Sequence, residues 1–247
     1  MNGMAVVVGL GEVGEPLLRL IERERQPVVG IDIETDSFPQ RGSVDVMHIC
    51  FPFQVDDFVG EAKRYIDLMA PALTVVNSTV PVGTTRAIQD ETGARLAYSP
   101  IRGKHSAMLD QLTHYVKFVG ADDRATATQA ADHFASLGMQ TKIVDSPETA
   151  ELAKLTETTY FGLLIAWAQT VDRWCAQTGA DYDQVVSFYD EVSFFPRVKY
   201  FPGVIGGHCV MPNIELLAQI FESEFLDAIR SSNAQQVALE GAAVGLS

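Results

Sequence analysis

The chain has 247 residues, enough for one large or two modest domains, and its 47% hydrophobic and 20% charged content is that of an ordinary globular protein. Its formal net charge of -14 argues against a nucleic-acid partner, because such binding depends on clustered Lys and Arg side chains. The longest aromatic and apolar run, residues 160–168, is too short to span a bilayer, and the start of the sequence shows no secretory leader. We therefore expect no membrane span and a cytoplasmic location.

The first predicted strand, residues 5–8, breaks into a turn with the spacing G-x-G-x-x-G, and a helix follows from about Glu15. In a dinucleotide-binding fold the first glycine permits the tight turn, the second lets a pyrophosphate approach the backbone, and the third lets the helix pack closely on the strand. The alternative is that the glycines only shape a turn. The cofactor-binding residues predicted here are Gly9, Gly11, Glu12, Val13 and Gly14.

A second predicted strand, residues 27–32, follows after one helix length and ends on Asp32. A carboxylate at this distance from the turn accepts hydrogen bonds from the adenosine ribose and repels a 2′-phosphate, so the pattern favours NAD over NADP. Residues 33–43 leave no room for both the crossover helix and the strand of a complete Rossmann half. The predicted nucleotide-binding domain is therefore abbreviated.

Strands and helices then alternate, as expected for a doubly wound, mainly parallel sheet. Strands are predicted at residues 44–51, 73–78, 96–100, 115–120 and 141–144, and helices at residues 58–69 and 122–137. Pro52, Ser78 and Thr79 follow two of these strands and are further cofactor candidates. The hydroxyl groups of residues 79–84 either contact a ligand or only cap the next helix.

The predicted loop at residues 101–111 carries Arg102, Lys104 and His105, the densest positive group of an acidic chain. These side chains either receive an anionic substrate or are simply solvated.

A long helix is predicted from Pro147, which follows Ser146 as N-cap, to about residue 178, before Gly179. Its surface is largely apolar, so we expect it to pack against several neighbours or to form a homodimer. We place a domain boundary near Asp145, which gives an NAD-binding domain over residues 1–145 and a helical domain over residues 146–247. Further helices are predicted at residues 181–190 and 213–241, and a loop at residues 194–207.

Two features of the second half contain candidate catalytic residues. Lys154 lies in the first turns of the long helix, and a glycine-opened turn, residues 206–209, presents His208 and Cys209. A cysteine in such a turn beside a histidine can be held partly as thiolate, the form that attacks carbon electrophiles. The alternatives are a solvated lysine and a small buried cysteine. With Cys50 and Cys175, the cysteines are odd in number and widely spaced, which suits neither a disulfide framework nor a zinc site.

Five segments together resemble the UDP-glucose/GDP-mannose dehydrogenase family, most of all its UDP-N-acetylmannosamine branch. They are residues 9–14, Asp32, and residues 78–84, 150–155 and 196–209. In such enzymes, the resemblance implies, NAD oxidises a primary alcohol of a nucleotide sugar to an aldehyde, a cysteine traps the aldehyde, and a second oxidation gives a thioester that water hydrolyses. We also expect the third, nucleotide-gripping domain of these enzymes to be absent from this chain.

The resemblance implies that Cys209 supplies the covalent handle, that Lys154 stabilises the developing oxyanion, and that Thr79 helps to order the water. The chain departs from the family at three positions: the asparagine four residues after the lysine is Thr158, the aspartate four residues after the cysteine is Asn213, and an acid-base glutamate is Ile101. The catalytic candidates are thus Cys209, Lys154, Thr79, His208, Thr158 and Asn213.

Three hypotheses follow from these observations. The first is an NAD-dependent oxidoreductase that oxidises an alcohol or aldehyde of an anionic small molecule through Cys209. The second is a hydroxyacid-type dehydrogenase that uses Lys154 and transfers a single hydride. The third is an NAD-binding protein without catalytic activity.

Overall fold

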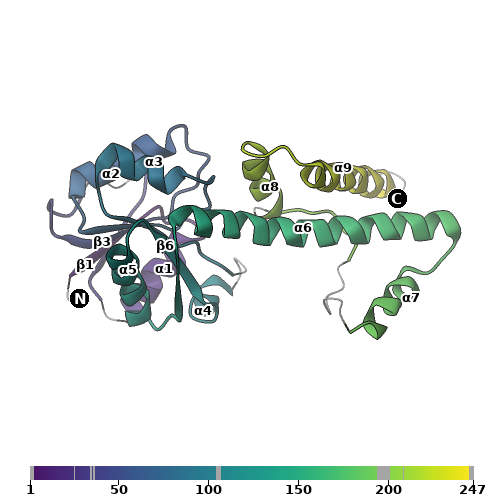
Figure 1. The fold of residues 1–247 in the computed structure, drawn as a ribbon, viewed down its shortest axis with the longest axis horizontal. Helices are drawn as coiled ribbons and strands as arrows, with labels where there is room; N and C mark the ends of the chain where they lie inside the picture. Colours follow the sequence, from purple (N-terminus) through teal and green to yellow (C-terminus); the bar gives the residue numbers. More distant parts are fainter. Residues whose placement is uncertain are drawn as a thin grey trace. The chain divides into compact units, whose positions relative to one another are not determined.

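The computed structural model describes residues 3–24, 26–33, 35, 37–103, 107–193, 201–207 and 209–244. The chain divides into two compact units, residues 1–154 and 155–247, each shown in Figure 1. The division lies inside the long helix α6 (Pro147–Thr178), after Lys154, whereas the boundary predicted from the sequence precedes this helix.

The first unit is built on one seven-stranded sheet in the order β2-β1-β3-β4-β5-β6-β7. Its strands are β1 (Met4–Val8), β2 (Val28–Ile31), β3 (Val44–Ile49), β4 (Leu73–Val76), β5 (Leu96–Tyr98), β6 (Lys117–Ala121) and β7 (Thr141–Val144). The strands from β2 to β5 in this order are parallel, β6 pairs antiparallel with β5, and β7 pairs in parallel with β6. The predicted α/β fold with a mainly parallel sheet is therefore confirmed.

Helices cover both faces of this sheet (Figure 1). They are α1 (Gly14–Arg23), α2 (Phe58–Met69), α3 (Thr84–Thr92), α4 (Met108–Gln111) and α5 (Arg124–Ser136). Because alternate residues of a strand point to opposite faces, Val7 of β1 packs in the core beneath α1, α4 and α5, whereas Val6 and Val8 pack in the core beneath α2 and α3. Burial on both faces explains why the strands read as continuous apolar runs.

The connection from β2 to β3 is short. Of residues 32–43, those that the structure describes contain neither a helix nor a strand, so β2 forms the edge of the sheet. A complete Rossmann half would place one more strand outside β2. The prediction of an abbreviated domain agrees with this arrangement.

Most predicted elements are present, and several boundaries differ. Helix α2, strand β7 and helix α6 have the predicted bounds. The strands predicted at residues 44–51 and 73–78 end at Ile49 and Val76, because the amides of Asn77 and Ser78 both donate to the Ile49 carbonyl as the chain turns. The prediction that all of residues 101–111 form a loop is wrong, since Met108 begins the short helix α4 and is buried in the core.

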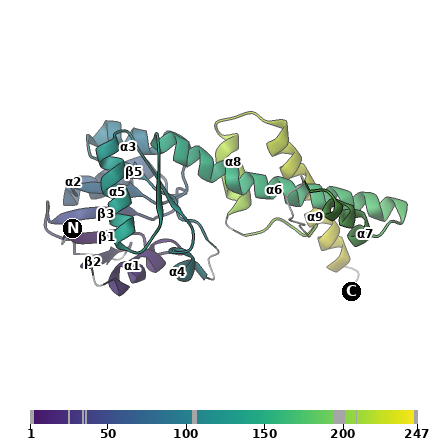
Figure 2. The same ribbon diagram turned by 60° about the horizontal axis from the view of Figure 1, so that its bottom comes forward.

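In the second unit, the described residues of α6 pack against the remaining helices. These are α7 (Tyr182–Ser187), the 3₁₀ helix η2 (Phe188–Glu191), α8 (Val210–Ala218) and α9 (Glu224–Val244). Helix α9 lies next to α6 in Figure 1 and crosses it obliquely in the turned view of Figure 2. A Cβ atom on Gly162 of α6 would lie 2.7 Å from Val210 Cγ1, so the glycine permits the close approach of α8. None of the described helices is long and apolar enough to cross a membrane.

The first turns of α6 are joined to α3 by a buried carboxylate. Glu151 is fully buried, and its carboxylate accepts hydrogen bonds from the Gly83 amide at 2.7 Å, the Thr85 amide at 2.9 Å and the Thr85 hydroxyl at 2.6 Å. A negative charge at a helix N-terminus is also favoured by the helix dipole. Burial raises the pKa of Glu151, and the hydrogen bonds from Thr85 and Gly83 act in the opposite direction.

The alternative that the hydroxyl groups of residues 79–84 cap α3 is wrong. The N-cap residue is Gly83, which has no side-chain oxygen and a φ of +93°. The Thr84 hydroxyl donates to the Pro81 carbonyl instead. The cap comes from Glu151, 66 residues beyond Thr85 in the sequence, a contact that no local pattern signals.

We expect Glu151→Ala to lower the free energy of unfolding by about 3 kcal/mol, because two backbone amides and a hydroxyl lose their buried acceptor. Urea denaturation followed by circular dichroism measures the change. Glu148→Ala is the matched control on the same helix: it removes an exposed ion pair with Arg86 and should cost less than about 1 kcal/mol. Equal losses in the two variants would show that Glu151 is not the principal attachment of α6.

Candidate functional site

The three glycines after β1 serve different purposes. A Cβ atom on Gly9, whose φ is +90°, would lie 2.6 Å from the Phe51 amide nitrogen, and one on Gly14 would lie 1.8 Å from the Gly9 carbonyl oxygen. Packing within the protein therefore requires these two glycines. A Cβ atom on Gly11 would meet no protein atom within 4 Å. The open space at Gly11 fits the close approach of a pyrophosphate to the backbone.

The N-terminus of α1 is open to an anion. Its N-cap residue, Val13, provides no side-chain cap, whereas Asp57 caps α2 and Asp123 caps α5. Backbone N–H groups and the helix dipole at such an end attract phosphate. Because β1 has β2 on one side and β3 on the other, this end also lies at the point where the strand order reverses, the usual ligand crevice of an open α/β sheet.

Asp32 lies directly beyond β2, beside this crevice. Its carboxylate is exposed, and one oxygen accepts a hydrogen bond from the Ile33 amide at 2.9 Å. Its own amide donates to the Thr35 hydroxyl, which fixes the turn after the strand. A carboxylate held at this sheet edge fits a ribose hydroxyl, so the residues present suit NAD.

The remaining cofactor candidates follow β3 and β4. The Ser78 hydroxyl is buried and donates to the Phe51 carbonyl at 2.6 Å, so it ties the ends of the two strands together. Pro52 is exposed and Thr79 is half-buried at the same sheet edge. Their contacts with a cofactor stay predictions.

Lys154 is not a simply solvated lysine. It is half-buried, and its Nζ donates to the Ile101 carbonyl oxygen at 3.1 Å. The Ile101 side chain, at the position where the resemblance implies a glutamate, is buried in the core. Position 101 therefore contributes a backbone carbonyl to the lysine instead of a carboxylate.

Part of the positive loop can be placed. The Arg102 guanidinium lies over the rings of Tyr115 and Phe118, at 5.5 and 5.7 Å from their centroids. Lys104 and His105 lie outside the described residues. The role of this loop in binding an anion stays a prediction.

In the second unit, two of the departures from the family pattern contact each other. The Asn213 side-chain amide donates to the Thr158 hydroxyl at 2.6 Å, and Asn213 is buried. The resemblance implies an asparagine on α6 and an aspartate on α8. The chain instead has a hydroxyl group on α6 and the amide on α8, so the pair carries no charge.

Cys209 is exposed, whereas Cys50 and Cys175 are buried. It is the N-cap residue of α8, which begins at Val210, three residues before the predicted helix at residues 213–241. Proline is tolerated in a first helical turn, because the amides there have no partner within the helix. His208 lies outside the described residues.

Sequence reasoning missed a buried polar cluster behind the crevice. The Asn77 side-chain amide donates to the Ser99 carbonyl at 2.6 Å, which leaves its oxygen to accept from His48 Nδ1 at 2.9 Å. With His48 neutral, its Nε2 then accepts from His133 Nε2 at 2.9 Å. Burial lowers the pKa of both histidines, that of His133 to about 4. A histidine inside the apolar run of β3 was the signal available in the sequence.

Lys117 belongs to the same cluster. Its buried Nζ donates to the carbonyl oxygens of Ser99 at 2.8 Å and Pro100 at 2.9 Å, and Lys154 binds the next carbonyl, that of Ile101. Burial lowers the pKa of Lys117 from 10.5 to about 7; the nearby Cys50 raises it, and the charge of Lys154 lowers it further. Two lysines thus hold three consecutive carbonyl groups where the chain leaves β5.

The pKa of Lys117 leads to a pH prediction. Between pH 7 and 10.5 the unfolded chain binds more protons at this lysine than the folded chain does, so the free energy of unfolding rises with pH. We expect the stability of the wild type relative to Lys117→Met to rise by about 2 kcal/mol between about pH 7 and 9. Urea denaturation at three pH values measures this, with the exposed Lys142→Met as control. A constant difference would contradict the shift.

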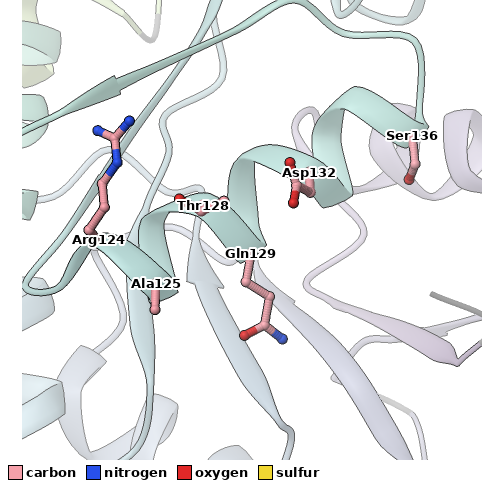
Figure 3. A pocket seen from close by; sticks show the side chains of 6 residues that line it. All are labelled: Arg124, Ala125, Thr128, Gln129, Asp132 and Ser136. Carbon is pink, nitrogen blue, oxygen red and sulfur yellow. The ribbon is translucent and has the colours of Figure 1, made fainter.

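A hollow on the outer side of α5 lies elsewhere in the first unit (Figure 3). Its lining residues all come from this helix: Arg124, Ala125, Thr128, Gln129, Asp132 and Ser136. None of the residues predicted to bind cofactor or substrate lines it. The candidate site therefore lies at the carboxyl ends of the strands, where the sequence places the predicted residues, and not at this hollow.

The fold and the open glycine turn define a Rossmann-type α/β unit joined to a helical unit. Residues 148–237, which include Lys154 and Cys209, match the model of the UDP-glucose/GDP-mannose dehydrogenase family, central domain. This match confirms the family resemblance carried by the sequence motifs.

Several proteins named as dehydrogenases are similar to this chain over most of its length. The UDP-N-acetyl-D-mannosamine dehydrogenase of Methanococcus vannielii is 25% identical over 83% of this chain. The UDP-D-ManNAc dehydrogenase structure from Pyrococcus horikoshii covers 98% of this chain and 70% of its own, with a TM-score of 0.81 at 22% identity. A Mycobacterium tuberculosis 3-hydroxyisobutyrate dehydrogenase structure covers 96% of this chain and 94% of its own, with a TM-score of 0.74 at 15% identity. The chain spans 58% of the length of the Methanococcus vannielii relative.

Proposed function

We propose that this chain carries the NAD-binding and catalytic parts of a dehydrogenase that oxidises an alcohol group of a nucleotide sugar. The observation that carries the proposal is the family match over residues 148–237, which contains both Lys154 and Cys209. The open turn at Gly11 and the exposed Asp32 support NAD as the cofactor. The names of the relatives favour a UDP-N-acetylhexosamine, an anionic small molecule.

NAD supplies a hydride acceptor when it is bound. Lys154, oriented by the Ile101 carbonyl, is suited to stabilise the alkoxide as the alcohol loses its proton. Cys209 is suited to add to the resulting aldehyde, since its exposure leaves the thiol accessible. Oxidation of that adduct gives a thioester, and water releases the acid and restores the thiol. The uncharged pair Thr158 and Asn213 provides polar groups for this last step but no general base.

The test is an assay of NADH formation from UDP-N-acetylmannosamine with NAD⁺ or NADP⁺. We expect two NADH per sugar with NAD⁺ and little reaction with NADP⁺. Lys154→Ala should lower kcat by about a hundredfold, because the oxyanion loses its cation. Cys209→Ala should stop at the aldehyde and yield one NADH per sugar.

Other outcomes of this assay identify the alternative hypotheses. One NADH per substrate from the wild type, with Cys209→Ala unchanged, would favour a single-hydride dehydrogenase that uses Lys154. Tight NAD binding in calorimetry without turnover would favour a protein that binds the cofactor and has no activity. Unchanged turnover in Lys154→Ala would remove the proposed mechanism altogether.

We also propose a homodimer formed through α6. Tyr160, Trp167 and Trp174 follow one another at seven-residue spacing on one side of this helix, and each is about half exposed. The two tryptophan rings meet edge to face at 5.7 Å. An aromatic stripe of this size is unusual on the surface of a monomer and is typical of a helix that packs against another copy.

Light scattering coupled to size exclusion tests the dimer. We expect twice the chain mass for the wild type and the chain mass for Trp167→Glu, because a charge in the centre of the stripe must be desolvated on association. The control is Gln177→Glu, which adds the same charge at an exposed position of the same helix. A wild-type monomer at micromolar concentration would contradict the proposal.

A further inference from the structure

The segment that leads to Cys209 is held by side chains of two helices. Residues 201–207 form neither a helix nor a strand. The Gly203 carbonyl nevertheless accepts a hydrogen bond from Gln169 Nε2 of α6 at 2.7 Å. The Ile205 amide donates to Asn233 Oδ1 of α9 at 2.7 Å, and the Ile205 carbonyl accepts from Asn233 Nδ2 at 3.2 Å.

Asn233 thus acts on Ile205 as a neighbouring strand would, with one donor and one acceptor. Two hydrogen bonds to one residue fix both the position and the rotation of its peptide groups. They also fix the orientation of the asparagine amide, since only one assignment of its oxygen and nitrogen satisfies both partners. Asn233 and the Ile205 side chain are buried, so a lost hydrogen bond is not readily replaced by water.

Gln169 is itself held in place. It is fully buried, its Oε1 accepts from the Ser232 hydroxyl at 2.8 Å, and Arg173 Nη2 donates to the same hydroxyl at 3.1 Å. Its Nε2 also lies 3.5 Å from Asn233 Oδ1. The two carboxamides therefore form one connected unit, which we call the amide clamp, Gln169 and Asn233.

The turn that carries the thiol is fixed at both ends. On one side the amide clamp holds residues 203–205; on the other, α8 begins at Val210, which packs against the surface that Gly162 opens. Between these ends lie Gly206 and Gly207, and glycine has a more permissive backbone than any other residue type. The Val204 amide also donates to Glu240 Oε1 at 3.2 Å, but this contact is exposed, so the buried amide clamp is the stronger hold on this end of the turn.

We propose that Asn233, with Gln169, is a positioning residue that places the Cys209 thiol for its addition to the aldehyde, an inference that rests on the proposed function. In that step the S–H adds across C=O: a C–S bond forms and the proton goes to the oxygen. A hydride then leaves the same carbon for NAD⁺ while the hydroxyl group loses its proton to solvent, which gives the thioester, and water cleaves the C–S bond to give the acid and the thiol. The first oxidation does not use the sulfur, so a displaced thiol affects only the second.

The test compares Asn233→Asp with the control Gln235→Glu, which adds the same charge at an exposed site of the same helix. Aspartate keeps the acceptor for the Ile205 amide but places a carboxylate oxygen against the Ile205 carbonyl. We expect hydrogen exchange in residues 203–207 to accelerate about tenfold. The NADH yield per sugar should fall from two toward one, with free aldehyde trapped by hydroxylamine, while the first oxidation keeps its rate.

Unchanged exchange in Asn233→Asp would overturn the clamp, and faster exchange with a yield of two NADH would overturn the positioning role. If the wild type forms no NADH, the proposed function fails. The clamp is then tested by itself, by comparing the rate at which iodoacetamide alkylates Cys209 in the wild type and in Asn233→Asp. A change of about threefold or more in the Cys209 rate, with the buried Cys50 and Cys175 still protected, supports the clamp, and equal rates overturn it. If Asn233→Asp does not fold, Gln169→Glu keeps the acceptor for Ser232, removes the Nε2 donor to Gly203 and Asn233, and serves the same comparison.

Discussion

The contact on which the first unit depends is the buried carboxylate of Glu151 at the N-terminus of α3. It satisfies two backbone amides and a hydroxyl, and so fixes where α6 begins on the α/β unit. Lys154 follows three residues later on the same helix and reaches the Ile101 carbonyl. Glu151 thus fixes the part of α6 that carries Lys154, the strongest catalytic candidate in this unit.

A second constraint lies behind the crevice, where polar groups replace apolar ones. The chain of His48, Asn77 and His133 and the buried Lys117 connect β3, β4, β5, β6 and α5. Such groups are costly to bury unless they are hydrogen-bonded, and here burial also lowers the pKa of both histidines. These hydrogen bonds link the strands beneath their carboxyl ends and fix the Ser99 and Pro100 carbonyl groups where the backbone leaves β5.

Local patterns in the sequence predicted much of the architecture. The glycine spacing located the turn after β1, and the start signal at Ser146 to Glu148 with Gly179 gave both ends of α6, because these signals depend on nearby residues. Contacts between residues that are far apart in the sequence could not be predicted. Neither the Glu151 cap, the Thr158–Asn213 pair nor the hold of Asn233 on Ile205 has a spacing rule, since each joins residues brought together only by the tertiary fold. The resemblance supplied the chemical candidates, but not what surrounds them.

The open space at Gly11 separates a glycine needed for cofactor binding from the glycines needed for folding. Gly9 and Gly14 are required for the chain to fold, so their loss would remove the protein, whereas a methyl group at Gly11 meets nothing in the polypeptide itself. A side chain at Gly11 would therefore oppose the approach of a dinucleotide and leave the packing of the scaffold intact.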